Sequence, residues 1–179
     1  LLGRWFGKPV TITLRGTEVP LSRIASRRRR MLIALRRSAR IFSVAEALKQ
    51  HVVNLGIESS KIQVVGNGVD TEKFYPLARQ KAREELGLPM KVPILISVGG
   101  LVERKGFHRV IECLPELSKR FPGLRYLIVG GASAEGDWSE RLRQQVADLK
   151  LESSVVFLGA MPSERLKIPL SAANVFVLS

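Results

Sequence analysis

The sequence predicts an α/β protein with two doubly wound, Rossmann-like parallel-sheet domains, both incomplete in this chain of 179 residues. Three observations predict that class. Short apolar runs lack the strict alternation of a half-exposed strand, which indicates strands buried on both faces. Helical patterns lie between the runs, and such alternation produces a parallel sheet with right-handed crossovers. Finally, three successive strands end on glycine.

Seven apolar runs predict the strands, and their order along the chain divides them into two sheets. The runs are Val10–Leu14, Ile41–Val44, Ile62–Val65, Ile94–Val98, Tyr126–Val129, Val155–Leu158 and Val175–Leu178. A charged stretch that is rich in turn residues separates the third run from the fourth. We therefore predict a first domain over residues 1–68 and a second over residues 69–179.

Helical periodicity between the strands predicts the helices. Apolar residues recur at helical spacing from Phe107 to Leu117 and again from Leu142 to Leu149. A further helix is expected from Glu46 to Leu55. Ser163 is placed to cap a short helix that Pro169 should interrupt, because proline removes a backbone donor.

Composition indicates a globular chain whose ends look cut. Hydrophobic residues make up 45% of the sequence, which excludes intrinsic disorder. No apolar run approaches the roughly 20 residues of a membrane-spanning helix. A single cysteine cannot form an internal disulfide, which favours a reducing compartment. The chain starts LLGRWF and stops on a strand-like NVFVLS, so we expect a fragment of a longer protein.

Most of the net charge of +13 comes from one segment. Residues 22–40 hold eight arginines and no acidic residue. An apolar stripe could be formed by Ile24, Met31, Leu32 and Leu35. One interpretation is a basic amphipathic helix whose cations, Arg23–Arg40, contact an anionic membrane. The other is a solvated helix that packs one face on the sheet. No DNA- or RNA-binding motif accompanies the charge, so nucleic acid is not expected.

Glycines directly follow three successive predicted strands, and we call these positions the glycine exits. They predict a ligand site. The glycines are Gly99, Gly100, Gly130, Gly131 and Gly159. In an open parallel sheet such exits lie at the carboxyl edge, where ligands bind. Arg104 and Lys105 directly precede a predicted helix start, where anions are favoured. We predict a phosphate-bearing ligand, although the spacing is neither a dinucleotide-binding motif nor a P-loop. Ordinary turns with two solvated cations are the alternative.

Several segments, in order, resemble the family 4 glycosyltransferases, also called group 1, which have the GT-B fold. They are SVAEALKQ, VVGNGVDTEKFYP, ILISVGGLVERKGFHRVIECLPEL, YLIVGG, VVFLGAMPSERL and SAANVFVLS. The resemblance implies that residues 1–68 are the C-terminal part of the acceptor domain and residues 69–179 most of the donor domain. It implies retaining transfer from a nucleoside-diphosphate sugar to a cell-envelope glycan or lipid-linked acceptor. It also implies a cytoplasmic enzyme, held against the inner membrane face, without a metal or cofactor.

The resemblance assigns roles to residues of the predicted site. Lys105 matches the lysine that contacts the donor diphosphate, and Gly99 matches the loop glycine beside it. The family usually has arginine directly after that glycine, but this chain has Gly100. Our hypothesis is that Arg104 supplies the missing cation.

The resemblance also marks the nucleotide-base region and the acceptor side. The base region contains Gly130, Gly131, Phe157, Leu158 and Gly159. Arg15 and Gly16 fall where many relatives have a His-Gly pair near the reaction centre, and Asn67 lies at the domain crossing, in an Asn-Gly pair that predicts a turn. Because arginine replaces that histidine, no catalytic base is assigned. The family's sugar-binding glutamate pair, E-x7-E, is expected after Ser179.

Two other functions remain open. A nucleotide-sugar epimerase of the same fold would keep the diphosphate site but should carry acidic and histidine residues in both domains. A polyanion- or membrane-binding module without catalysis would keep the arginine segment and bind no nucleotide sugar.

Overall fold

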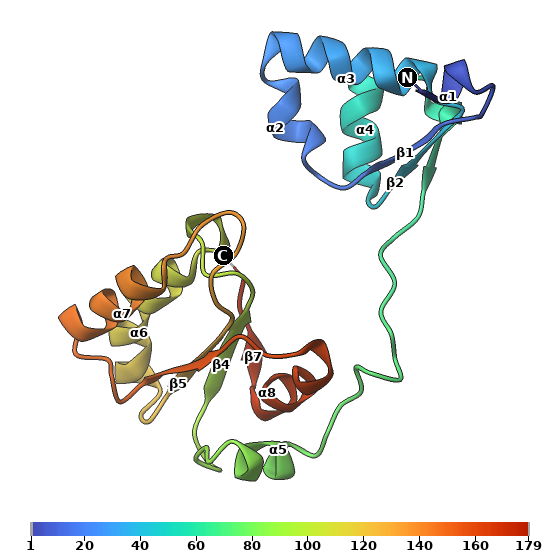
Figure 1. The fold of residues 1–179 in the computed structure, drawn as a ribbon. Helices are drawn as coiled ribbons and strands as arrows, with labels where there is room; N and C mark the ends of the chain where they lie inside the picture. The colour runs from blue at the N-terminus through green and yellow to red at the C-terminus, as the bar shows by residue number, and fades with distance from the viewer. Residues whose placement is uncertain (1, 179) are drawn as a thin grey trace. The chain divides into compact units, whose positions relative to one another are not determined.

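The chain folds into two compact units, Leu1–Val69 and Asp70–Ser179. A computed structural model describes residues 2–178 and is drawn in Figure 1. Within the described residues, no helix is long and apolar enough to cross a membrane.

Unit 1 contains a three-stranded parallel sheet in the order β1-β2-β3. Its strands are β1 (Thr11–Leu14), β2 (Arg40–Ser43) and β3 (Ile62–Val64). Its helices are α1 (Leu2–Trp5), α2 (Glu18–Ser22), α3 (Ala25–Arg37), α4 (Glu46–Asn54) and the 3-10 turn η1 (Ser59–Lys61). Each strand lies within one residue of its predicted position at either end.

The core of unit 1 lies between its sheet and the helices α3 and α4. It is built from Leu14, Leu35, Ile41, Leu48, Val52, Ile57 and Ile62. Met31 and Leu32 pack against this cluster. The prediction that Ile24 belongs to the same stripe is wrong, because Ile24 precedes α3 with extended backbone and is 46% exposed. All eight arginines of residues 22–40 are exposed.

Unit 2 contains a four-stranded parallel sheet in the order β6-β5-β4-β7. Its strands are β4 (Ile94–Val98), β5 (Arg125–Val129), β6 (Val155–Gly159) and β7 (Val175–Phe176). Its helices are α5 (Arg79–Glu85), α6 (Phe107–Arg120), α7 (Ser139–Asp148) and α8 (Lys167–Ala172), with 3-10 turns η2 (Glu103–Lys105) and η3 (Ser163–Arg165). The predicted parallel sheet is therefore present.

Helices cover both faces of the unit 2 sheet, as Figure 1 shows. The core under α6 and α7 contains Phe107, Ile111, Leu114, Tyr126, Ile128, Leu142 and Val155. The opposite core, under α5 and α8, contains Ala82, Ile94, Ile96, Leu127, Val129, Ile168 and Ala172. The strand residues alternate between these two cores, so each central strand is buried on both faces, which explains its continuous apolar run.

Pro169 lies inside α8 and does not interrupt it, contrary to prediction. It is the third residue of the helix, where the backbone N–H has no partner within the helix. Proline therefore removes no helical hydrogen bond at this position. Its backbone carbonyl accepts a hydrogen bond from the N–H of Ala173 at 3.2 Å.

A buried arginine joins α5 to the end of α8. Arg83 is 3% exposed, and its Nε donates to the Ala172 carbonyl at 2.9 Å. Its Nη2 donates to Asn174 Oδ1 at 2.8 Å, and its Nη1 to the Met90 carbonyl at 2.5 Å. Asn174 Oδ1 also accepts the backbone N–H of Ile94 at 2.9 Å. These neutral oxygens satisfy the guanidinium, so no buried carboxylate is needed.

Candidate functional site

Backbone hydrogen bonds continue the unit 2 sheet beyond its strand ends and hold the three glycine exits in register. The N–H of Gly99 donates to the Val129 carbonyl at 2.9 Å, and the N–H of Gly130 donates to the Gly159 carbonyl at 2.8 Å. Two residues beyond Gly99, the N–H of Leu101 donates to the Gly131 carbonyl at 2.9 Å. The predicted exits therefore lie side by side at the carboxyl edge.

Two of these glycines are required by close approach of their neighbours. A β-carbon on Gly130 would lie 1.8 Å from the Gly99 carbonyl oxygen, and Gly130 has a φ of 147°. A β-carbon on Gly100 would lie 2.9 Å from the Ser133 β-carbon. The exits are thus packed together as bare backbone, which leaves room for a ligand above them.

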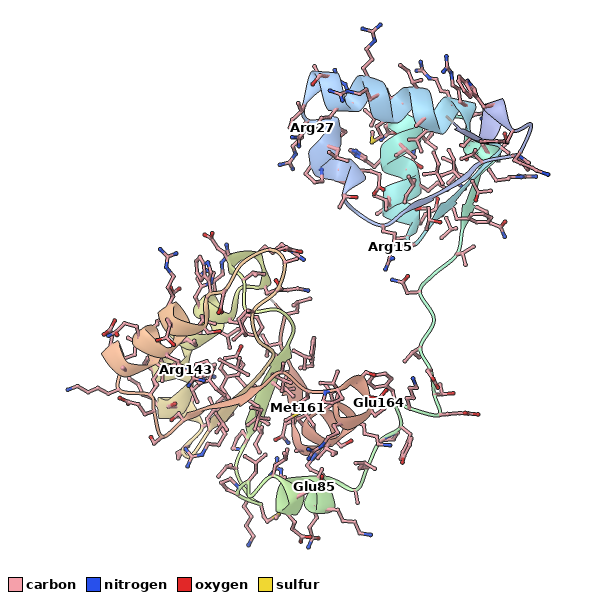
Figure 2. The ribbon with its side chains drawn as sticks, in the orientation of Figure 1. Arg15, Arg27, Glu85, Arg143, Met161 and Glu164 are labelled. Atoms are coloured by element: carbon pink, nitrogen blue, oxygen red, sulfur yellow. The ribbon has the colours of Figure 1, made fainter. Side chains whose placement is uncertain are left out.

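The glycine hollow, as we call it, occupies about 300 Å³ at this edge. It is lined by Val98, Gly99, Gly100, Val129, Gly130, Gly131, Ala132, Ser133, Ala160, Met161 and Leu166. Met161 is labelled in Figure 2. Sequence reasoning missed Ser133, Met161 and Leu166 because they belong to loops or to the start of a helix. Ser133 and Met161 had a signal, since each follows a glycine exit by two residues.

Lys105 lies beside the glycine hollow, and its side-chain stem covers Gly99. A β-carbon on Gly99 would be 3.6 Å from Lys105 Cε and 3.7 Å from its Cδ. Lys105 ends the turn η2, and α6 begins two residues later at Phe107. The positive end of α6 and the Lys105 ammonium are therefore both near the first glycine exit. Among residues 2–178 Lys105 forms no salt bridge.

Arg104 turns to Glu135 in the loop after β5. Its Nε and Nη2 donate to the two carboxylate oxygens of Glu135, so the pair is bidentate. The hydrogen bond from Arg104 lowers the pKa of Glu135, and the charge of Lys105 adds to that effect. Both partners line a second hollow of about 430 Å³ with Val102, Glu103 and Trp138. Arg104 is thus near the predicted site without lining the glycine hollow.

The residues predicted for the nucleotide base separate in space. Gly130 and Gly131 line the glycine hollow. Phe157 packs against the core under α6 and α7, with Arg143 4.4 Å above its ring, and Figure 2 labels that arginine on α7. Leu158 packs against the opposite core. The side chains of Phe157 and Leu158 therefore line no part of the hollow.

The predicted acceptor-side residues lie in unit 1. The N–H groups of Arg15 and Gly16 donate to Glu18 Oε2 at 3.2 and 2.8 Å. Glu18 is the first residue of α2, and its carboxylate closes the loop after β1. The Arg15 side chain is exposed, as Figure 2 shows. Asn67 is exposed in the extended segment after β3, so the Asn-Gly pair forms no turn.

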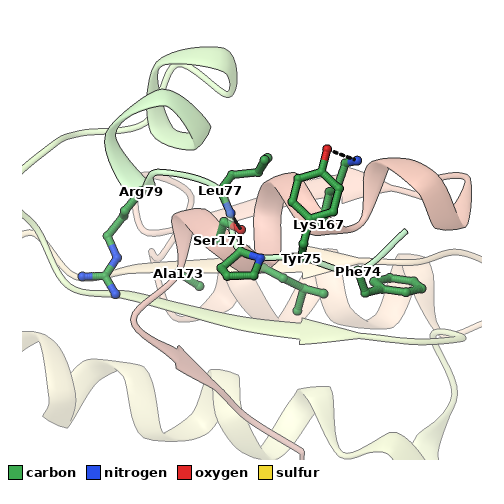
Figure 3. Close-up of a pocket in the computed structure, with 9 residues that line it drawn as sticks. Phe74, Tyr75, Leu77, Arg79, Lys167, Ser171 and Ala173 are labelled. Atoms are coloured by element: carbon green, nitrogen blue, oxygen red, sulfur yellow. Dashed lines mark hydrogen bonds between the residues drawn. The ribbon is translucent and has the colours of Figure 1, made fainter. Parts of the chain in front are cut away.

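A third hollow, of about 400 Å³, lies beside α8 (Figure 3). The segment that leads into α5 forms one wall of it. Lys167 Nζ donates to Tyr75 Oη at 2.9 Å and lies 4.1 Å from the centre of that ring. The N–H of Leu77 donates to Ser171 Oγ at 3.0 Å. These contacts fix the entering segment on α8, and no motif in the sequence predicts this hollow.

No group of three or more His, Cys, Asp or Glu side chains that could hold a metal ion occurs within residues 2–178. Charged groups on the two loops that border the glycine hollow include Lys105, Arg104 and Glu135.

Two family models match the chain. The model of the glycosyl transferases group 1 matches residues 78–179, and that of glycosyltransferase family 4 matches residues 1–73. The first match alone spans more than half of the chain.

Individual proteins are similar to the chain in sequence or in fold. A GDP-mannose-dependent alpha-(1-6)-phosphatidylinositol monomannoside mannosyltransferase of Mycolicibacterium smegmatis is 36% identical over 67% of this chain and 31% of its own length. The amylovoran biosynthesis glycosyltransferase AmsK of Erwinia amylovora is 29% identical over 96% of the chain and 40% of its own length. The chain therefore spans 31–40% of these two relatives.

Solved structures give the same fold. The crystal structure of Alr3699/HepE from Anabaena, in complex with UDP and glucose, superimposes with a TM-score of 0.82. It is 22% identical, and the match covers 99% of this chain and 48% of that one. The predicted α/β class of GT-B type is confirmed.

Proposed function

The chain belongs to the group 1 glycosyltransferases, and from this membership we propose that the complete protein transfers a sugar from a nucleoside-diphosphate sugar to a glycan or lipid-linked acceptor. The configuration at the anomeric carbon is retained. Unit 2 binds the donor, and unit 1 belongs to the acceptor side. The acceptor is part of the bacterial cell envelope, and the enzyme works in the cytoplasm.

One observation carries the donor assignment: the Lys105 stem packs against Gly99, which lines the glycine hollow. Bare backbone at the carboxyl edge admits a flat or extended ligand, and a cation beside it selects for phosphate. Lysine acts as a point charge, which suits a diphosphate whose charge is spread over several oxygens. Gly99, Gly100 and Lys105 form the diphosphate end, and Gly130 and Gly131 form the nucleotide end.

The chemistry needs charge stabilisation at the leaving group. Cleavage of the sugar–phosphate bond leaves a nucleoside diphosphate with increased negative charge on its terminal oxygens. Groups that are already oriented towards those oxygens stabilise the transition state most. Lys105 and the positive end of α6 fill this role, and no metal or cofactor is part of the proposal. We assign no catalytic base to residues of this chain.

The similar proteins support a donor of the nucleoside-diphosphate class and do not identify its base or sugar. The Mycolicibacterium relative depends on GDP-mannose, and HepE was crystallised with UDP and glucose. Both are proteins that use a nucleoside diphosphate, which supports the diphosphate end of the proposal. The base and the sugar of this donor are left to measurement.

Calorimetric titration of the complete protein with UDP-, GDP- and ADP-sugars tests the donor site. At least one of these nucleotide sugars should bind. The Lys105→Ala variant should bind it with about tenfold lower affinity, which corresponds to about 1.4 kcal/mol of binding free energy. The matched control is Lys119→Ala, because Lys119 is exposed on α6 and pairs with Glu116 at 3.0 Å. Equal affinity of the Lys105 variant and the wild type would remove the assignment.

Arg15, Gly16 and Asn67 form the acceptor side in this proposal. Arg15 is an exposed cation directly after β1, at the carboxyl edge of the unit 1 sheet. A cation there suits an acceptor that carries phosphate, such as a lipid-linked sugar. Arg15→Gln should raise the KM for the acceptor and leave the donor affinity unchanged. A raised donor KM would contradict the division of roles between the units.

The arginine segment Arg23–Arg40 holds the enzyme against anionic lipid. Its arginines are exposed on and around α3, while Leu35 is buried in the core of unit 1. Each basic residue near an anionic membrane surface contributes about 1 kcal/mol of attraction. Figure 2 labels Arg27, in the first turn of α3.

Flotation with vesicles of phosphatidylglycerol and phosphatidylcholine tests this contact. Changing Arg27–Arg30 to Gln should release the protein from the anionic vesicles. The control changes Lys81, Lys91, Lys119 and Lys150 to Gln, which removes the same charge from exposed positions of unit 2. If both variants bind as the wild type does, the membrane contact is refuted.

A further inference from the structure

Building on the proposed donor site, we infer that Glu135 is a positioning residue for donor binding. Through Arg104 it ties the turn that carries Lys105 to the loop that carries Ser133. In this role Arg104 remains on Glu135 when the donor is bound, and Lys105 alone supplies the side-chain cation for the diphosphate.

Glu135 belongs to a tightly closed loop after β5. The N–H of Ser133 donates to the Gly136 carbonyl at 3.0 Å, and the N–H of Gly136 donates back to the Ser133 carbonyl at the same distance. The N–H of Glu135 donates to Ser133 Oγ at 3.2 Å. A shift of the Glu135 backbone therefore moves Ser133, which lines the glycine hollow.

On the other side, Arg104 lies within the turn η2, whose last residue is Lys105. The N–H of Lys105 donates to the Val102 carbonyl at 3.1 Å, which fixes the turn on the strand exit. The Lys105 stem rests on Gly99, and Ser133 rests on Gly100. The Arg104–Glu135 pair thus closes a ring of contacts around the first glycine exit.

The geometry favours a lasting pair. Two parallel hydrogen bonds use the Nε and Nη2 edge of the guanidinium, which is one of the two edges that could bind a phosphate. The pair faces the second hollow, with Trp138, and does not line the glycine hollow. The backbone N–H of Trp138 donates to the Leu101 carbonyl at 2.7 Å, which fixes Trp138 in place.

Loss of this pair should leave the fold intact. Arg104 and Glu135 are 62% and 51% exposed at their side chains. Exposed ion pairs contribute little to the free energy of unfolding. The pair instead orders two loops, and an enzyme loses affinity when the groups that hold its ligand are less well positioned.

The test is a double-mutant cycle on donor affinity in the complete protein. Glu135→Gln, Arg104→Gln and the double variant are titrated with UDP, GDP and ADP, and kcat and KM are measured with the sugar donor that binds. Each single variant should weaken binding and raise KM by a similar factor of about five, and the double variant should be no weaker. Unfolding temperatures should stay equal, and kcat should change little.

Salt provides a readout that a purely structural role would not give. Exposed charges are screened within about 3 Å at 1 M ionic strength, so the difference between wild type and Glu135→Gln should shrink there. The matched control is Glu116→Gln, which removes an exposed pair with Lys119 away from the strand exits. It should bind as the wild type does at every ionic strength.

Three results overturn the inference. Tighter binding by Glu135→Gln would mean that Glu135 competes with phosphate for Arg104. Unchanged binding would mean that the pair has no role, and a much larger loss in Arg104→Gln than in Glu135→Gln would mean that Arg104 touches the donor itself. If Lys105→Ala weakens binding in these cases, the proposed function survives. If the wild type binds no nucleoside diphosphate, both proposals fail.

Discussion

Gly130 stands so close to Gly99 that a β-carbon on it would lie 1.8 Å from the Gly99 carbonyl oxygen. No side chain can be accommodated there unless β4 and β5 separate at their carboxyl ends. Gly130→Ala should therefore cost more than about 3 kcal/mol of unfolding free energy, through the clash and the φ of 147°. Thermal unfolding of the complete protein measures this.

Gly131→Ala is the control for that prediction. Its β-carbon would lie 3.6 Å from the Ala160 β-carbon, an ordinary contact, so this variant should fold normally. Equal unfolding temperatures of the two variants would show that the strand exits are not packed as described.

Arg83 should be among the most sensitive positions of unit 2. Arg83→Ala leaves the Ala172 and Met90 carbonyls without this donor and opens a cavity between α5 and α8. We expect a loss of about 3 kcal/mol in unfolding free energy. Arg79→Ala, at the exposed first residue of α5, should lose less than about 0.5 kcal/mol. Chemical denaturation, monitored by a signal from unit 2, measures the unfolding free energy of the two variants.

Stability at high pH should depend on Tyr126. Burial raises the pKa of Tyr126 to about 12, and its hydroxyl donates a hydrogen bond to Ser97 Oγ at 2.8 Å. Between pH 10 and 12 the unfolded chain ionises this hydroxyl while the folded chain keeps it protonated. The folded state then binds more protons, so unfolding free energy falls as pH rises, by up to about 1.4 kcal/mol per pH unit.

Tyr126→Phe should flatten that part of the stability profile. Tyr75→Phe is the control, because Tyr75 is 46% exposed beside α8, and it should keep the wild-type profile. The test is to measure the unfolding free energy at intervals from pH 9 to 12. If its slope against pH were identical in Tyr126→Phe and the wild type, the role of burial would be contradicted.

The strands and the glycine exits could be predicted because each depends on local pattern and on a rule of parallel sheets. Ile94–Val98 is continuous and apolar since it is buried on both faces, and its predicted bounds are those of β4. Gly99 and Gly130 meet because neighbouring parallel strands end at the same edge. Both conclusions follow from the residue pattern of each strand and from the order of the strands along the chain.

The side chains around those exits could not be predicted, because their partners are distant in sequence. Arg104 pairs with Glu135, 31 residues away, and the loop after β5 that carries Glu135 has no pattern that reveals its conformation. The residue type of Pro169 alone predicts an interruption, whereas its effect depends on where the helix begins. The apolar pattern likewise includes Ile24, although α3 begins one residue later at Ala25.

Phe157 provides the last prediction, which separates packing from ligand contact. Its ring lies under Arg143 on the α7 side of the sheet, so it is a core residue and not part of the glycine hollow. Phe157→Leu should lower unfolding free energy by about 1 kcal/mol, from lost packing and the lost cation–π contact. Nucleotide affinity, measured by titration with UDP and GDP, should stay within about twofold. A clear loss of affinity at unchanged stability would mean that this ring contacts the base directly.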